Sequence, residues 1–202
     1  MSEENSQGVS DDDKAIARKL AAAFNRPIKV FSHRDDEQDD LEVNVFYAPD
    51  APARGVASYG TIGLSNSPLF TPKGEAQHRL ELVGACASEV EHFPNALATV
   101  AMKIMGGHPA FPGAIFHGVI DTYKLSPTMS SMMLVDPFLW DDSFAAETLS
   151  AKTVAWLQAI PISKEEAQFA QANGADALTD LFVEEQIDVY DIERSSVVGR
   201  GA

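Results

Sequence analysis

Residues 152–169, KTVAWLQAIPISKEEAQF, contain the transition that decides the fold. Residues 152–160 form an apolar run of strand length, and we expect the strand to end at Pro161. Ser163 and Glu166 then form the Ser-x-x-Glu pattern of a capping box, which predicts a helix that begins here and runs through Phe169. A strand that passes directly into a helix indicates a domain that combines a sheet with helices.

The rest of the chain supplies more of both elements. Ser10 and the aspartates after it predict a helix over residues 11–25, and the spacing from Phe93 to Met105 predicts a second helix before Gly106. A helix over 175–185 follows the capping-box helix. Alternating or apolar runs predict strands over residues 27–33, 41–47, 55–64, 78–85, 114–120, 131–135 and 189–192.

These elements predict an α/β fold, a single-domain sandwich of a mixed, largely antiparallel sheet with flanking helices. The glycines inside 55–64 indicate a bulge or a close backbone approach. We expect residues 1–10 to be a disordered N-terminal tail, residues 11–197 to form the domain, and residues 198–202 to form a flexible tail.

The charge of the chain restricts its partners. The 202 residues include 15 Lys and Arg against 30 Asp and Glu, a formal net charge of −15. This charge disfavours direct binding to nucleic acid or to a membrane and favours a basic protein partner, although it also serves solubility alone in many proteins. One cysteine, Cys86, and no apolar run long enough to cross a bilayer predict a cytoplasmic protein.

The sequence offers little for catalysis. It contains no His-Glu-x-x-His, no Gly-x-Ser-x-Gly and no phosphate-binding glycine loop. His33 with Asp35 and Asp36 has donor atoms for a metal, but acidic loops are more often solvated surface. We therefore expect no metal, no cofactor and no enzyme activity; a hydrolase that depends on His33 or Asp36 is the least favoured hypothesis.

A protein-binding surface is the better candidate. Residues 137–142, PFLWDD, place aromatic side chains beside carboxylates, and residues 188–193, DVYDIE, read as an acidic edge strand that a partner could extend. The alternatives are that the aromatic residues close the core and that charge only blunts the edge. With the acidic connection after Arg34, the candidate partner-binding residues are Asp35, Asp36, Glu37, Asp39, Asp40, Phe138, Trp140, Asp141, Asp142, Tyr190 and Asp191.

The order of several motifs resembles the suppressor of fused (SUFU) domain family over about residues 25–197. The motifs include YGTIGLS at 59–65, RLELV at 79–83, DPF at 136–138 and VAWLQAIPI at 154–162. The helix with Pro94 and Leu97, the segment NGAD at 173–176 and the closing Arg194 also fit. No single motif is decisive; their order carries the resemblance.

The resemblance implies an α/β sandwich that acts by stoichiometric binding, without catalysis or a cofactor. Bacterial members are regarded as immunity proteins or antitoxins of polymorphic toxin systems, and the animal members capture a peptide strand of a transcription factor. We expect this chain to lack the long second domain of the animal proteins, so their peptide-binding residues are not carried over. The expected function is an immunity protein that neutralises a basic toxin domain; the alternative is a regulatory module that binds an endogenous protein by strand addition.

Overall fold

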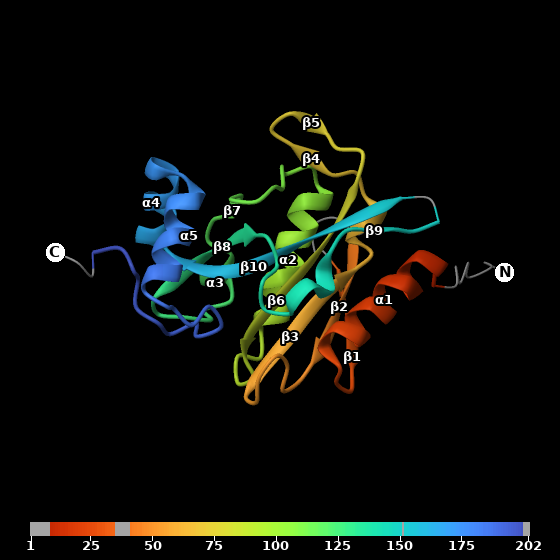
Figure 1. Ribbon diagram of the computed structural model, residues 1–202, viewed down its shortest axis with the longest axis horizontal. Helices are drawn as coiled ribbons and strands as arrows, with labels where there is room; N and C mark the ends of the chain where they lie inside the picture. The colour runs from red at the N-terminus through yellow and green to blue at the C-terminus, as the bar shows by residue number, and fades with distance from the viewer. Residues whose placement is uncertain (1–8, 35–40, 151, 200–202) are drawn as a thin grey trace.

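The computed structural model describes residues 9–34, 41–150 and 152–199, which form one mixed sheet packed against helices (Figure 1). All neighbouring strands are antiparallel except β6 and β10, which are parallel. A separate two-stranded sheet consists of β4 (Phe70–Thr71) and β5 (Gly74–Glu75), and β9 (Glu147–Thr148) pairs with β10. The main strand order is β1 (Lys29–Arg34), β2 (Glu42–Ala48), β3 (Val56–Ile62), β6 (Arg79–Ala87), β10 (Thr153–Ser163), β8 (Met129–Val135) and β7 (Ile115–Phe116). The predicted mixed, largely antiparallel α/β fold is confirmed.

Helices cover both faces of this sheet. Side chains of β10 alternate between the faces, so Trp156 and Ile160 point to one face and Leu157 to the other. The first face carries α1 (Asp11–Phe24) and η2 (Asp141–Phe144) at one end and α4 (Lys164–Asn173) with α5 (Ala175–Glu184) at the other. The second face carries α2 (Phe93–Met105), α3 (Val119–Thr122) and the short η1 (Leu64–Asn66). None of the described helices is long and apolar enough to span a bilayer.

The predicted helices form because caps and apolar spacing agree. The Ser10 hydroxyl accepts a hydrogen bond from the Asp13 amide at 3.0 Å, and Leu20, in the middle of α1, is fully buried. A Cβ atom at Gly60 of β3 would collide with the Leu20 side chain, so glycine lets α1 approach the sheet. The close backbone approach predicted for this strand is confirmed at Gly60.

The strand that was expected to end at Pro161 continues to Ser163. Pairing of β10 with β6 ends at Ala159, and beyond this point β8 is the neighbour of β10. The Pro161 carbonyl points to the side of β10 where β6 no longer pairs, and there it accepts a hydrogen bond from Arg194 Nη2 at 3.0 Å. The N–H and C=O groups of one strand residue point to the same side of the strand. The position of a Pro161 N–H would therefore face Arg194 and not β8, so its absence removes no hydrogen bond between strands.

Two further strand predictions were wrong. The strand expected over 114–120 is only the two-residue β7, because Gly118 at φ 71° turns the chain into α3. The edge strand expected over 189–192 is a series of turns. Its aspartates compete with strand pairing, since Asp188 and Asp191 accept hydrogen bonds from backbone amides two residues later.

Candidate protein-binding site

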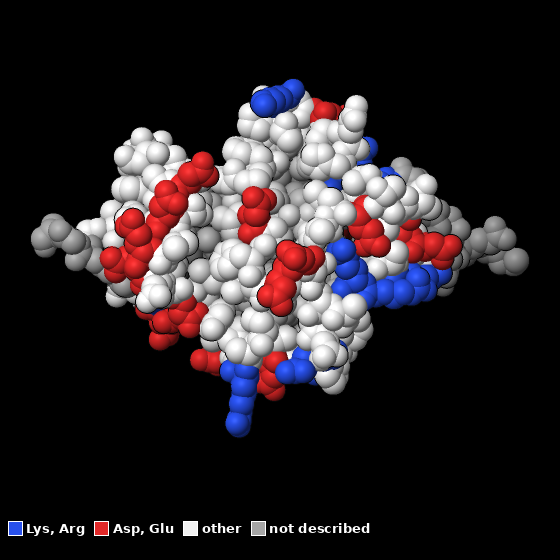
Figure 2. Space-filling model, in the orientation of Figure 1, with Lys and Arg blue, Asp and Glu red and all other residues white. Residues whose placement is uncertain are grey.

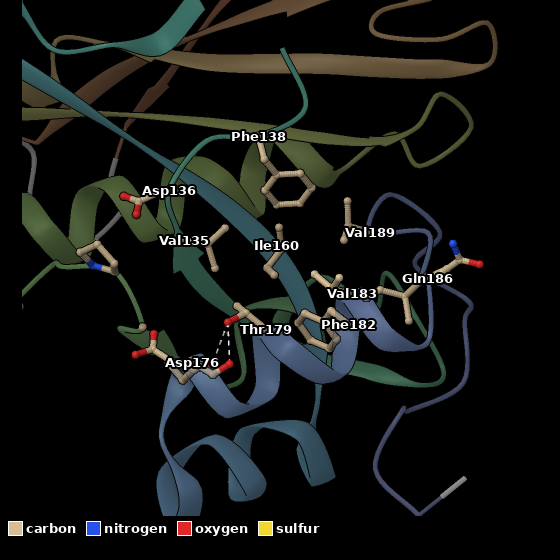
Figure 3. Close-up of a pocket in the computed structure, with 14 residues that line it drawn as sticks. Val135, Asp136, Phe138, Ile160, Asp176, Thr179, Phe182, Val183, Gln186 and Val189 are labelled. Carbon is tan, nitrogen blue, oxygen red and sulfur yellow. Dashed lines mark hydrogen bonds between the residues drawn. The ribbon is translucent and has the colours of Figure 1, made fainter. Parts of the chain in front are cut away.

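A groove of about 670 Å³ lies between α5, the end of β8 and the loop after β8 (Figure 3). Its floor is apolar and combines three elements: Val135 of β8, Ile160 of β10 and Phe182 of α5. This volume is in the range of sites that take several side chains or a small ligand. The groove is therefore large enough to receive part of a partner.

The wall on one side of the groove is α5. Leu178 and Phe182, four residues apart, are buried against the sheet, whereas Thr179 and Val183, each one position later, line the groove. The Thr179 hydroxyl donates to the Asp176 carbonyl at 2.8 Å within the helix (Figure 3). Val183 is 76% exposed, the highest value among the exposed large hydrophobic side chains of the described residues.

The opposite wall is the loop that carries Phe138. The Phe138 amide donates to Gln158 Oε1 at 3.1 Å. Two residues later the Trp140 indole is buried, and its Nε1–H donates to Ser58 Oγ at 2.9 Å. These two anchors fix the loop and leave the Phe138 ring 53% exposed, across the groove from Val183 (Figure 3).

The rim of the groove is acidic. Asp136 and Asp176 are the ionisable residues among those that line it. Residues 165–193 include nine Asp and Glu and no Lys, Arg or His, and Figure 2 shows acidic side chains gathered over α4 and α5. An apolar floor with a negative rim suits a basic protein surface.

The structure separates the residues that the sequence singled out. Phe138 lines the groove, but Trp140 is only 5% exposed, because its ring packs against Phe24 and Phe144 at centroid distances of 5.5 and 5.4 Å. Of the two candidate aromatic residues, Trp140 therefore follows the alternative of closing the core, and only Phe138 remains a candidate contact residue. Asp141 and Asp142 are exposed in η2. The acidic candidates that lie outside the described residues are Asp35, Asp36, Glu37, Asp39 and Asp40.

The second predicted segment reaches the groove through a different residue. Tyr190 is half-buried and its carbonyl accepts a hydrogen bond from the Ala87 amide at 3.2 Å, while Asp191 is exposed. Their neighbour Val189 lines the groove. The sequence analysis did not identify Val183. Its apolar side chain beside the buried residue Phe182 was a signal that α5 has an apolar surface outside the core.

The described residues offer no candidate metal site. They contain no group of three or more His, Cys, Asp and Glu placed to hold a metal ion. Burial raises the pKa of the Cys86 thiol to about 12, so little thiolate forms at neutral pH. Burial also lowers the pKa of His33, and its proposed partner Asp36 lies outside the described residues.

Comparison with known sequences identifies relatives over most of the chain. Residues 37–195 match the family described as Suppressor of fused protein (SUFU). Immunity protein YqcF of Bacillus subtilis (strain 168) is 37% identical over 192 residues, which cover 95% of this chain and all of that protein.

Solved structures share the fold at lower identity. A SUFU homologue from Neisseria gonorrhoeae FA 1090 superposes with a TM-score of 0.72 at 17% identity, over 95% of this chain and 99% of that chain. A chain of the Sufu–Fu complex gives 0.62 at 14% identity, over 91% of both chains. Drosophila Suppressor of Fused gives the same score and identity over 91% of this chain and 50% of that chain. The family match and the full-length relative show that this chain belongs to the suppressor of fused (SUFU) protein family.

Proposed function

We propose that this chain is an immunity protein that neutralises a toxin by binding it in a one-to-one complex, without catalysis or a cofactor. The observation that carries the proposal is the groove, because its apolar floor and acidic rim suit a protein partner. The name of the B. subtilis relative supports a toxin as that partner, and the Sufu–Fu complex is a precedent for protein binding by this fold.

The charge of the chain indicates the kind of toxin. A protein with a net charge of −15 attracts a basic domain and accelerates their encounter at low salt. Nucleases hold the phosphate backbone with Lys and Arg side chains, so an acidic protein that covers these side chains excludes the nucleic acid. We therefore propose a basic, nuclease-type toxin domain as the partner and the bacterial cytoplasm as the place of action.

The proposal predicts a toxin gene beside the gene for this chain, and the test uses the toxin domain which that gene encodes. Coexpression of this chain should restore growth to a bacterial host that produces the toxin domain, and calorimetry should give one chain bound per toxin. The association rate should fall by about tenfold or more between about 50 mM and about 500 mM NaCl. Failure to restore growth, or inactivation of many toxin molecules by one chain, would refute the proposal.

The regulatory alternative has one structural feature in its favour. Within the described sheet, β1 pairs only with β2, and its Val30 and Phe31 side chains are 50% and 45% exposed. This edge of the sheet is open to strand addition, whereas residues 189–192, the edge strand expected from the sequence, form no strand. Under this alternative, Phe31→Ser should weaken partner capture more than any change in the groove.

A further inference from the structure

We propose that the groove between α5 and Phe138 is the surface that contacts the toxin, and that it receives a toxin segment with bulky apolar side chains flanked by Lys or Arg. This inference rests on the proposed function and assigns to it a site and a partner chemistry. It differs from strand addition, because the contacts are made by side chains and no backbone pairing is required.

The apolar part of the argument depends on two exposed side chains. Val183 is 76% exposed and Phe138 is 53% exposed, and they face each other across buried Ile160 and Phe182. In the free protein, water contacts these apolar groups and part of the floor. A partner that fills the groove removes this surface from water, which is the main favourable contribution to protein association.

The charge of the rim selects among apolar segments. Asp136 and Asp176 line the groove, and α5 adds exposed Asp180 and Glu184. A neutral or acidic segment would cover carboxylates without pairing them, which is unfavourable. A segment with Lys or Arg beside its apolar residues pairs them, so the groove discriminates in favour of basic partners.

The walls of the groove are fixed before a partner binds. The Arg194 guanidinium lies 5.2 Å from the centroid of the Phe182 ring and forms two hydrogen bonds with the Glu166 carboxylate. Through Phe182, this buried ion pair packs against α5. The loop that carries Gly113 packs closely against the start of α5, because a Cβ atom on Gly113 would lie within 2.7 Å of the Ala175 Cβ atom. Preformed walls reduce the ordering cost of binding.

A second copy of this chain is a less suitable occupant. The exposed apolar side chains that a second copy offers outside the groove include Val30 and Phe31 of β1, beside Lys29. Each copy carries a formal net charge of −15, so two copies repel each other, whereas a basic toxin is attracted to the same surface. The toxin is therefore the occupant that the charges favour.

The decisive experiment compares two matched substitutions, Val183→Glu in the groove and Val30→Glu at β1. Both positions are exposed valines, so each substitution adds one carboxylate and leaves the core intact. For the toxin domain encoded beside the gene, Val183→Glu should raise the Kd by about 30-fold or more, as at a central contact, and Val30→Glu by less than about threefold. Phe138→Ser should behave like Val183→Glu, and thermal unfolding should confirm that all variants are folded.

The possible results separate this inference from the proposed function. If the wild-type chain neither binds nor neutralises the toxin domain, both are overturned. If the wild type binds and Val183→Glu binds equally well, or if Val30→Glu loses binding instead, only the groove assignment is overturned. Sedimentation velocity adds one further outcome: self-association that both substitutions abolish, with toxin binding unchanged, would make a second copy the occupant and overturn the assignment.

Discussion

The turn after β3 and the turn after β10 are each hydrogen-bonded to a fully buried glutamate, Glu81 and Glu166, and of the two only Glu166 forms an ion pair within the described part of the chain. After β10, Glu166 accepts two hydrogen bonds from Arg194, at 2.6 and 2.9 Å, and binds the Ser163 amide at the start of α4. After β3, Glu81 Oε1 accepts the Gly63 and Ser65 amides at 3.0 Å each, and Oε2 is hydrogen-bonded to the Thr61 hydroxyl.

The two regions show two ways to keep a carboxyl group inside a protein. Arg194 supplies a counter-charge to Glu166 where water is absent. Glu81 has no basic partner among the residues that the structure describes, and burial raises its pKa, which favours the uncharged acid. Both side chains accept hydrogen bonds from backbone amides at a helical turn that follows a strand. They differ in electrostatics, because Glu166 is paired with Arg194 and the pKa of Glu81 is raised by burial.

The largest expected effect comes from removing the cation. Arg194→Met would leave Glu166 buried without a counter-charge and should lower the free energy of unfolding by about 3–5 kcal/mol in urea denaturation. The double variant Glu166→Gln/Arg194→Met removes both charges and should recover much of this loss. A double variant as unstable as the single one would show that Arg194 acts by packing on Phe182, and the electrostatic half of the comparison would fail.

A smaller effect is expected at Glu81, where hydrogen bonds matter more than charge. Glu81→Ala leaves the Gly63 and Ser65 amides without their acceptor and should cost about 2–4 kcal/mol of unfolding free energy. At about pH 5, Glu81→Gln keeps an oxygen for both amides and should stay within about 1 kcal/mol of the wild type. Equal losses in the two variants would mean that the turn after β3 needs the carboxylate itself.

The same pair of regions explains what could be predicted from the sequence. The capping box of Ser163 and Glu166 is local, three residues apart, and it was predicted correctly, as were α1 and α2 from their spacing. The contacts of Glu81 with residues 61–65 join segments about twenty residues apart, and no local pattern indicates them. The capping-box pattern does not indicate that Arg194 pairs with Glu166, because the two residues are 28 positions apart in the chain.

The candidate site was predictable only in part for the same reason. Phe138 stood in an aromatic and acidic segment that the sequence singled out, but the burial of Trp140 depends on Ser58 and Phe24, which are distant in the chain. The groove forms because α5 lies against β8 and β10, so the position of Val183 in it cannot be predicted from the residues around Val183 in the chain. Local patterns located the elements, whereas packing between elements made the groove.

The smallest and most specific effect is the pH dependence that Glu81 should add. Burial raises its pKa above the ordinary value of 4.5, so the folded state holds a proton that the unfolded chain releases. The Glu81 contribution to stability is therefore fully present below about pH 4.5 and is lost as the pH rises toward the folded-state pKa. Urea denaturation between about pH 5 and pH 8 should show the wild type losing stability relative to Glu81→Gln, by at most about 1.4 kcal/mol per pH unit. A difference that does not change with pH would show that Glu81 titrates alike in both states, and the contrast with Glu166 would then lie in geometry alone.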